Sequence, residues 1–461
     1  MLSEDILLEI FDFYRLDAME RRQTRGRPWK WLHLAHVCRR WRHAISMSPR
    51  RLDLQILCKY GASIKYTLDA WETLPLIVRF KGGPKSKSLP ENIVTALCRP
   101  DRVREIDLDL TSTTVGAIVD EIKKPFQMLE SIRISIKDAT GPSLLFRSGF
   151  LGGSAPRLRE IDLDGITFPF PEIKQVFSST NNLVRLHLTK IPETGYFSVD
   201  TLVTALSSST QLRALGVGFH YPASLPTQSN TSPPFQRTTF PFLITLRFHG
   251  ASEYLEEFVS RVDFPSLGFI DIKLFHQIFF EIPEFCRTIP LLNAFMSPTE
   301  MEIKSGKDSV AMYFRQKGKH GIKSGDCYLR TVCERLDWQL SFVTEVSRQL
   351  FPLLESVGTL TISGNNIMPT LPSEEEDMDS TQWLEVFQPF THLRELHIPG
   401  KFVLDILQAL VTEDMAAGVF PELTRLSVAG VNKRNSATVV EAAEQFVAAR
   451  KLSGRTIRLS K

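Results

Sequence analysis

A short apolar pattern returns throughout residues 103–428, and it limits the possible folds more than any other feature. In each copy an apolar residue is followed by two other residues, a second apolar residue, one other residue and a third apolar residue. Because side chains alternate along a strand, each copy predicts a short strand with one buried face. Seven copies start 26, 29, 25, 29, 31 and 24 residues apart, and three more follow after a gap: Val103–Leu108, Leu129–Ile134, Leu158–Leu163, Leu183–Leu188, Leu212–Val217, Leu243–Phe248, Leu267–Ile272, Val357–Ile362, Leu393–Ile398 and Leu423–Val428.

This period is typical of leucine-rich repeats, in which each unit is one strand followed by a helix or turn. The segments between the copies have helical spacing, for example Leu202–Leu206 and Tyr254–Val259. Such a unit cannot bury its apolar face alone and stacks on its neighbours. The sequence therefore predicts an α/β fold over residues 91–461, an irregular leucine-rich-repeat-like solenoid with a curved parallel sheet inside and helices outside. An ordinary α/β sheet is the alternative, because its strands can carry the same pattern.

Three segments interrupt the repeats, at 219–240, 297–325 and 364–380. The first is rich in Pro, Ser and Thr, and the third holds the acidic run Glu374–Asp377, so both are expected to be loops. The second is expected to form a hairpin that turns at Ser305–Gly306. A helix at about 437–450 is expected to cap the last repeat, because the open end of a solenoid must be covered.

Residues 1–50 have a different pattern that predicts two amphipathic helices. Ser3 is a suitable N-cap, Leu2 can fold back onto Leu7, and Glu4 and Asp5 lie where the helix dipole favours negative charge. Two short helices cannot bury both of their apolar faces on each other, so the pattern implies a partner. The stripe of the first helix is Ile6, Leu7, Ile10, Phe11 and Tyr14, and that of the second, expected to run on from Trp31, is Leu34, Ala35, Val37, Cys38, Trp41 and Ile45.

These residues resemble the F-box pattern L-P-x-E-[IV]-L-x-x-I-[LF] followed by L-x-x-V-C-[RK]-x-W. The F-box is the helical module that docks on the Skp-type adaptor of SCF ubiquitin ligases. The chain departs from the pattern at Ser3 and Asp5, where the family usually has proline and glutamate, and it inserts the basic stretch Arg21–Arg27. The resemblance implies that the matching residues bind the adaptor: Leu2, Ile6, Leu7, Ile10, Phe11, Leu34, Val37, Cys38 and Trp41.

The C-terminal half also resembles a known group. Leu336–Leu340, Trp383–Phe390 and Gln445–Arg450 are similar to segments of the F-box proteins of mushroom-forming basidiomycete fungi. This resemblance implies an F-box at 1–50, a linker with a first strand or cap at 51–90, and a substrate-binding repeat domain at 91–461. From the F-box resemblance and the repeat pattern together, we expect a substrate-receptor subunit of an SCF-type, cullin-based ubiquitin ligase with a protein target. The alternative is a scaffold of the same build that recruits no ligase.

Composition limits the function classes. The formal net charge of +3 argues against a general binder of nucleic acid or of membrane surfaces, although residues 1–51 hold eleven Lys/Arg against six Asp/Glu. The six cysteines have no CxxC pairing and indicate the reduced thiols of an intracellular protein, cytoplasmic or nuclear. We expect no signal peptide, no membrane-spanning segment and no homo-oligomer.

No catalytic motif is present, so we expect a non-enzymatic protein without a cofactor or metal. The sequence has no GxSxG, HExxH, P-loop or kinase signature. The glycine–lysine pairs near Gly82 and Gly306 lack the spacing of a phosphate-binding loop. A solvated helix face explains His33, His36 and His43 beside the core thiol of Cys38 better than zinc does. Cys327 and Cys333 are expected to be buried thiols beside a strand, and Trp338 and Trp383 to be core anchors.

Charged residues between the apolar positions of the repeats should line the concave face of the sheet. In-register stacking would place Arg133 between Asp107 and Asp162, and Arg185 beside Glu160. Glu105, Asp109 and Asp164 would then be left over at one end, and Arg247 and His249 further along, giving a face graded from acidic to basic. The alternative is that these residues only form ion pairs that hold the sheet. The candidates for target binding are Asp109, Arg133, Asp164, Arg185, His187, Arg247 and His249.

Overall fold

The computed structural model has two compact units, Met1–Ala214 and Leu215–Lys461. The domain boundaries expected from the sequence, near residues 50 and 90, stay a prediction. The residues that the structure describes are 3–20, 32–48, 56–58, 64–82, 91–137, 149–166, 170–180, 182–220, 237–275, 282–289, 298–316, 326–333, 336–364, 380–399, 402–411, 418–429 and 436–460.

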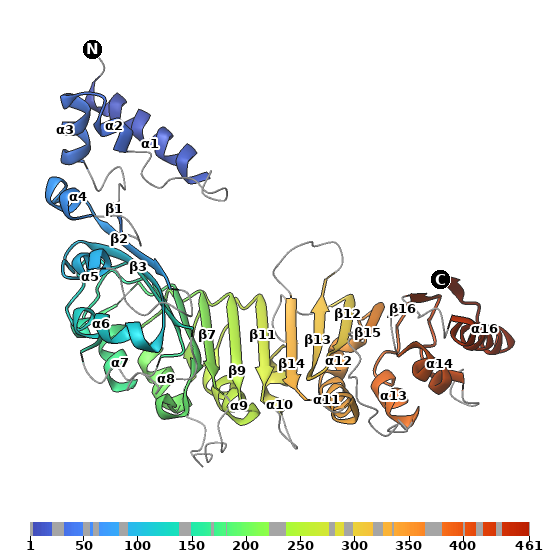
Figure 1. Cartoon of the computed structure of the whole chain (residues 1–461). Coiled ribbons are helices and arrows are strands. Elements are labelled where there is room, and N and C mark those ends of the chain that lie inside the picture. The colour runs from blue at the N-terminus through green and yellow to red at the C-terminus, as the bar shows by residue number, and fades with distance from the viewer. Residues whose placement is uncertain are drawn as a thin grey trace. The chain divides into compact units, whose positions relative to one another are not determined.

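The first unit begins with three helices and continues as an array of strands and helices (Figure 1). Its strands are β1 Ile56–Cys58, β2 Leu76–Lys81, β3 Val103–Leu110, β4 Ser131–Ile136, β5 Glu160–Asp164 and β6 Arg185–Ile191. Its helices are α1 Glu4–Glu20, α2 Leu32–Ala35, α3 Arg39–Met47, α4 Lys65–Ala70, α5 Glu91–Leu97, α6 Ser112–Ile122, η2 Phe150–Gly153, α7 Phe170–Ser179, η3 Glu193–Gly195 and α8 Val199–Leu206.

The strands of the first unit pair in the order of the sequence, and every pair is parallel. Burial alternates along them, as in β3, where Ile106, Leu108 and Leu110 are fully buried while Asp107 and Asp109 are half-buried. The apolar positions of the repeat therefore form the core beneath the sheet, and the positions between them form a polar face.

The second unit starts at the strand that follows α8. Its strands are β7 Ala214–Phe219, β8 Thr238–Thr239, β9 Thr245–Gly250, β10 Val262–Asp263, β11 Phe269–Leu274, β12 Glu300–Ser305, β13 Ser309–Arg315, β14 Asp326–Val332, β15 Thr359–Gly364, β16 Glu395–Pro399, β17 Arg425–Ala429 and β18 Arg458–Ser460. Its helices are α9 Ser252–Arg261, α10 Pro283–Thr288, α11 Leu336–Gln349, α12 Phe351–Leu354, α13 Ser380–Phe387, α14 Val403–Val411 and α16 Ser436–Leu452. Figure 1 shows α9, α10 and α11 along the same side of the strands.

The strand order of the second unit, β7-β9-β11-β14-β13-β12-β15-β16-β17-β18, departs from the sequence order at one place. The hairpin expected at 297–325 is confirmed as β12 and β13, which pair antiparallel. It does not interrupt the sheet, however, because β13 also pairs antiparallel with β14, while β12 is parallel to β15 and β14 to β11. Among the described pairs of this sheet, β13 alone runs against its neighbours.

All ten copies of the apolar pattern overlap a strand, so that prediction is confirmed. The expected capping helix is also present, as α16. The fold is mixed α/β with a mostly parallel sheet built from strand–helix units, as a leucine-rich-repeat-like array requires. The acidic run Glu374–Asp377 and most of the expected loop at 219–240 lie outside the described residues.

The expected second N-terminal helix is wrong in one respect, because it is two helices. The chain leaves α2 at Ala35, and Cys38 is fully extended, with φ −159° and ψ 171°, as the N-cap of α3. The Nε atom of Arg42 donates a hydrogen bond to the Ala35 carbonyl oxygen at 3.1 Å and so ties the two short helices together. The Ser3 cap is confirmed, since its hydroxyl oxygen accepts from the Ile6 amide at 3.4 Å.

Polar side chains that are buried or half-buried fix the turns between repeats. The carboxylate of Glu256 accepts from the backbone amides of Glu284 at 2.7 Å and Phe285 at 3.0 Å, which satisfies free donors at the start of α10. The guanidinium groups of Arg102 and Arg450 are buried and donate to backbone carbonyls of neighbouring turns. These side chains are structural, and they are absent from the apolar pattern that predicts the strands.

Candidate functional site

The three N-terminal helices form a small module, residues 3–20 and 32–48, with an apolar interior of its own. Leu7 and Phe11 on the inner face of α1 are buried, and the ring of Phe11 meets that of Trp41 edge to face, with centroids 5.0 Å apart. Leu34 is buried as well. These side chains stabilise the module, so a partner would meet other residues first.

A second apolar stripe on α1 faces away from this interior. Ile6, Ile10 and Phe13 recur at i, i+4 and i+7, which places them on one helix face, and they are 45%, 39% and 77% exposed. Val37, between α2 and α3, is 58% exposed. We call Ile6, Ile10, Phe13 and Val37 the outer stripe.

The single stripe expected from the sequence is therefore divided between an interior and a surface. Of the residues expected to contact an adaptor, Ile6, Ile10, Val37 and Cys38 are exposed, and Trp41 is half-buried. Leu7, Phe11 and Leu34 are interior, because α1 is apolar over two adjacent faces and the other helices cover one of them; their expected contact with an adaptor stays a prediction. Phe13 was missed, although its position seven residues after Ile6 could have revealed it. Leu2 lies outside the described residues.

On the polar face of the first unit, the predicted ion pairs are present. Register places Arg133 between Asp107 and Asp162, and its guanidinium lies 3.0 Å from the first carboxylate and 3.5 Å from the second. Arg185 lies 3.2 Å from Glu160. His187 is opposite Asp162 in the same sheet.

The acidic surplus expected at one end of this face is wrong. Asp109 lies 3.4 Å from the Nζ atom of Lys137 and 3.9 Å from Arg133. Asp164 lies 2.9 Å from Lys190. Glu105 is bound by Arg79, whose Nε donates at 3.0 Å. Arg79 lies on β2, which carries no copy of the apolar pattern, and Lys137 and Lys190 follow the copies at 129–134 and 183–188. A count of the positions inside the copies therefore did not include these partners.

Arg247 and His249 lie on the polar face of the second unit. Arg247 stacks on Phe269, 5.7 Å from the ring centroid, and has no ion pair within the part of the chain described. His249 packs against the ring of Phe275 at 5.2 Å. Burial, helped by Lys273, Arg330 and His220, lowers the pKa of His249 to about 4, so this imidazole is neutral near pH 7.

In the described ranges, no group of three or more His, Cys, Asp or Glu side chains is placed to hold a metal ion. No helix there is both long and apolar enough to cross a membrane. Cys327 and Cys333 are buried as expected, and Trp383 is a core residue. Trp338, expected in the core, is 43% exposed on α11.

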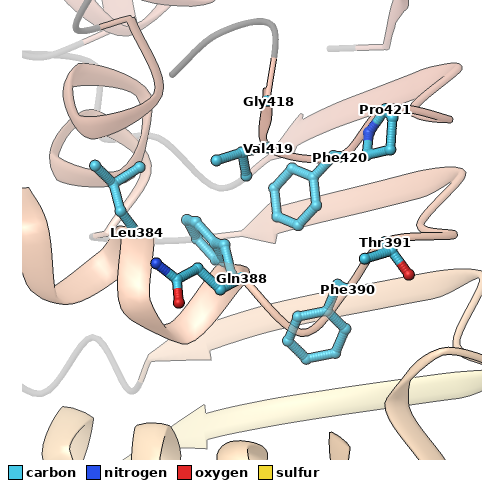
Figure 2. Close-up of a pocket in the computed structure, with 9 residues that line it drawn as sticks. Leu384, Gln388, Phe390, Thr391, Gly418, Val419, Phe420 and Pro421 are labelled. Atoms are coloured by element: carbon cyan, nitrogen blue, oxygen red, sulfur yellow. The ribbon is translucent and has the colours of Figure 1, made fainter. Parts of the chain in front are cut away.

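A pocket of about 200 Å³ lies between α13 and the turn before β17. Figure 2 shows Gln388 between Leu384 and Phe390, with Phe420 across the pocket. The rings of Phe387 and Phe420 are 5.0 Å apart. None of its nine lining residues is ionisable, and the polar side chains among them are those of Gln388 and Thr391: Leu384, Phe387, Gln388, Phe390, Thr391, Gly418, Val419, Phe420 and Pro421.

Comparison with known proteins adds little. No described protein family matches the sequence, and no curated protein matches it. Among solved structures, the chain is similar to the leucine-rich repeat-containing protein LegL7 from Legionella pneumophila, with 11% sequence identity, coverage of 74% of this chain and 97% of that one, and a TM-score of 0.25. The assignment of a repeat array therefore rests on the strand register described above.

Proposed function

We propose that the chain is a substrate-receptor subunit of an SCF-type, cullin-based ubiquitin ligase. In this proposal the N-terminal module binds a Skp-family adaptor, and the repeat array binds a protein target. The chain does no chemistry itself and acts in the cytoplasm or the nucleus by raising the local concentration of target near the ligase.

The outer stripe is the observation that carries the proposal. The module has already buried Leu7 and Phe11, yet it still presents three large apolar side chains along one face of α1. Exposed apolar residues that line up along a helix favour docking on a groove of a partner protein. The F-box resemblance of the same segment supports a Skp-type adaptor as that partner.

The polar faces of the array support a binding role for the rest of the chain. Within each unit the face is formed by strands that stack in register, so its side chains make a continuous surface. A repeat array of this kind offers contacts from many strands to one partner, which suits a protein target better than a small molecule.

Co-purification with a recombinant Skp-family adaptor tests the proposal. Ile6→Asp with Ile10→Asp places two charges in the outer stripe and should abolish adaptor capture while leaving the interior of the module intact. Tyr66→Asp with Leu452→Asp is the matched control, since both residues are exposed and lie outside the module. Equal capture by both double variants would refute the F-box assignment. Capture of the adaptor without cullin would favour the scaffold alternative.

A further inference from the structure

One row of the polar face of the second unit carries cations and no carboxylate. Register aligns His249 of β9 with Lys273 of β11, Arg330 of β14, Ala311 of β13 and Lys304 of β12. We call these five residues the basic row. Neighbouring strands lie ~4.8 Å apart, so the row is ~19 Å long.

Two of the three cations of the basic row have no ion-pair partner among the described residues. Arg330 lies 2.7 Å from Asp271, which belongs to the next row. Lys273 and Lys304 form no ion pair with any residue that the structure describes. In the turn after β12, Lys307 and Asp308 are both exposed and offset each other.

The state of His249 is a second sign of positive potential at this place. Burial contributes most to its lowered pKa, and Lys273, Arg330 and His220 lower it further, against a smaller opposing effect of Asp271. The polar face of the first unit differs in its charge balance. There, the acidic residues near the strand ends have cationic partners, as Asp109 has Lys137 and Asp164 has Lys190.

We propose that the basic row binds an extended acidic segment of a partner protein, laid across the strands. A length of ~19 Å matches about six residues of extended chain at ~3.3 Å per residue. Ala311 leaves room in the middle of the row, between the longer side chains of Arg330 and Lys304. This inference deepens the proposed function and rests on it in one respect. If the chain is a substrate receptor, the acidic segment that binds the basic row belongs to the target protein.

The surroundings favour carboxylates over nucleic acid. The aromatic residues beside the row cover one another: Tyr328 and Tyr313 meet edge to face at 5.1 Å, and Phe269 lies 5.4 Å from Tyr328 with Arg247 over its ring. Binding of single-stranded nucleic acid relies on open ring faces for base stacking. Carboxylates need only the exposed ammonium groups.

The test measures binding to the purified full-length chain without any adaptor. The probe is a fluorescein-labelled peptide of six consecutive glutamates, followed by fluorescence anisotropy at low salt and at about 0.5 M NaCl, where surface attraction is screened. Lys273→Glu with Lys304→Glu should weaken binding by about tenfold or more at low salt, and the difference should shrink at high salt. Lys65→Glu with Lys174→Glu, on helices of the first unit, changes the net charge equally and should retain most of the affinity.

Three results would overturn the inference: no peptide binding by the unaltered chain, an equal loss in both double variants, or tighter binding of oligothymidylate than of the peptide. The milder pair Lys273→Ala with Lys304→Ala, checked by circular dichroism, keeps the test valid if charge reversal disturbs folding. Adaptor capture by the Lys273→Glu and Lys304→Glu variant should be unchanged. Absence of peptide binding by the unaltered chain, with adaptor capture intact, therefore refutes this inference alone, and unchanged adaptor capture by the Ile6 and Ile10 variant refutes the proposed function alone.

Discussion

Replacing Arg102 with methionine should destabilise the first unit strongly. The side chain is 8% exposed and lies between α5 and β3. Its guanidinium donates to the carbonyl oxygens of Leu74 at 3.1 and 3.0 Å, Trp71 at 2.6 Å and Leu68 at 3.4 Å. One side chain thus holds the turn that connects α4 to β2.

The magnitude follows from what methionine leaves behind. The volume of methionine is similar, so little is lost through an unfilled cavity, but three carbonyl oxygens lose a charged donor, and two of them, those of Leu68 and Leu74, are in buried hydrogen bonds. Each unsatisfied buried acceptor costs ~1–3 kcal/mol, and the relief of no longer burying a cation offsets part of the sum, which leaves ~3 kcal/mol. For a unit of this size that corresponds to a fall of ~6–12 °C in melting temperature.

Calorimetry of the full chain, with hydrogen exchange of the β1 and β2 amides to localise the change, measures the effect. Arg99→Met is the matched control, because Arg99 is only three residues away and its 3.4 Å contact with Asp69 is exposed. Exposed pairs contribute ~0–1 kcal/mol, so this variant should melt almost as the original. If the two variants lose the same stability, the carbonyl contacts of Arg102 are not what holds the turn.

Four further outcomes are expected. Phe11→Ala should cost ~3–5 kcal/mol, and hydrogen exchange should show it in α1 and α3 without a change in the repeats; protection lost along β3–β6 as well would contradict a separate interior. Arg133→Met should lower the free energy of unfolding by only ~1 kcal/mol or less, because its ion pairs are partly exposed, and a larger loss in urea melts would argue against that value. Iodoacetamide at about pH 8 should label Cys38 and spare Cys58, since burial raises the pKa of Cys58 to about 12; labelling of both thiols in the folded chain would count against it. The free energy of unfolding should fall as pH drops from 6.5 toward about 4, because in this range His249 is protonated in the unfolded chain but neutral in the folded one. His249→Gln should flatten this dependence of the unfolding free energy on pH, and an unchanged dependence in urea melts would rule out His249 as its source.

The sequence predicts the regular part of the array well because one physical requirement repeats in it. Each strand must bury residues such as Ile106 and Leu108 on one face, and that requirement leaves a visible period. It leaves no such trace in β1, β2 and β18, which are short or lie outside the pattern. The buried arginines that bind backbone carbonyls are equally hard to predict, since nothing around Arg102 in the sequence shows which carbonyls its side chain reaches.

The candidate sites were predicted in part for a related reason. Pairs within the repeat, such as Arg133 with Asp107, follow from register alone, so they could be read in advance. The partners of Asp109 and Asp164 could not, because Lys137 and Lys190 lie where the strand ends and the chain turns. Likewise Leu7 and Ile6 are neighbours of equal hydrophobicity, and only the packing of Trp41 against Phe11 decides which of the two is covered.

The reversed strand β13 has a consequence for the order in which the second unit can be completed. Elsewhere a strand meets its neighbour about one repeat later, as Arg133 meets Asp107 from 26 residues away. The edge of β11, in contrast, is covered by β14, whose Arg330 lies 59 residues from its partner Asp271, and β15 rests on β12, with Ser363 and Glu302 61 residues apart. During synthesis from the N-terminus, β11 therefore remains an unpaired sheet edge until β14 has been made, after β12 and β13. An unpaired edge can form hydrogen bonds with strands of other chains. Nascent chains halted between residues 300 and 325 should be the most prone to aggregate, and the segment from β12 to β14 cannot be trimmed or grafted one strand at a time, because these three strands form a single unit of assembly.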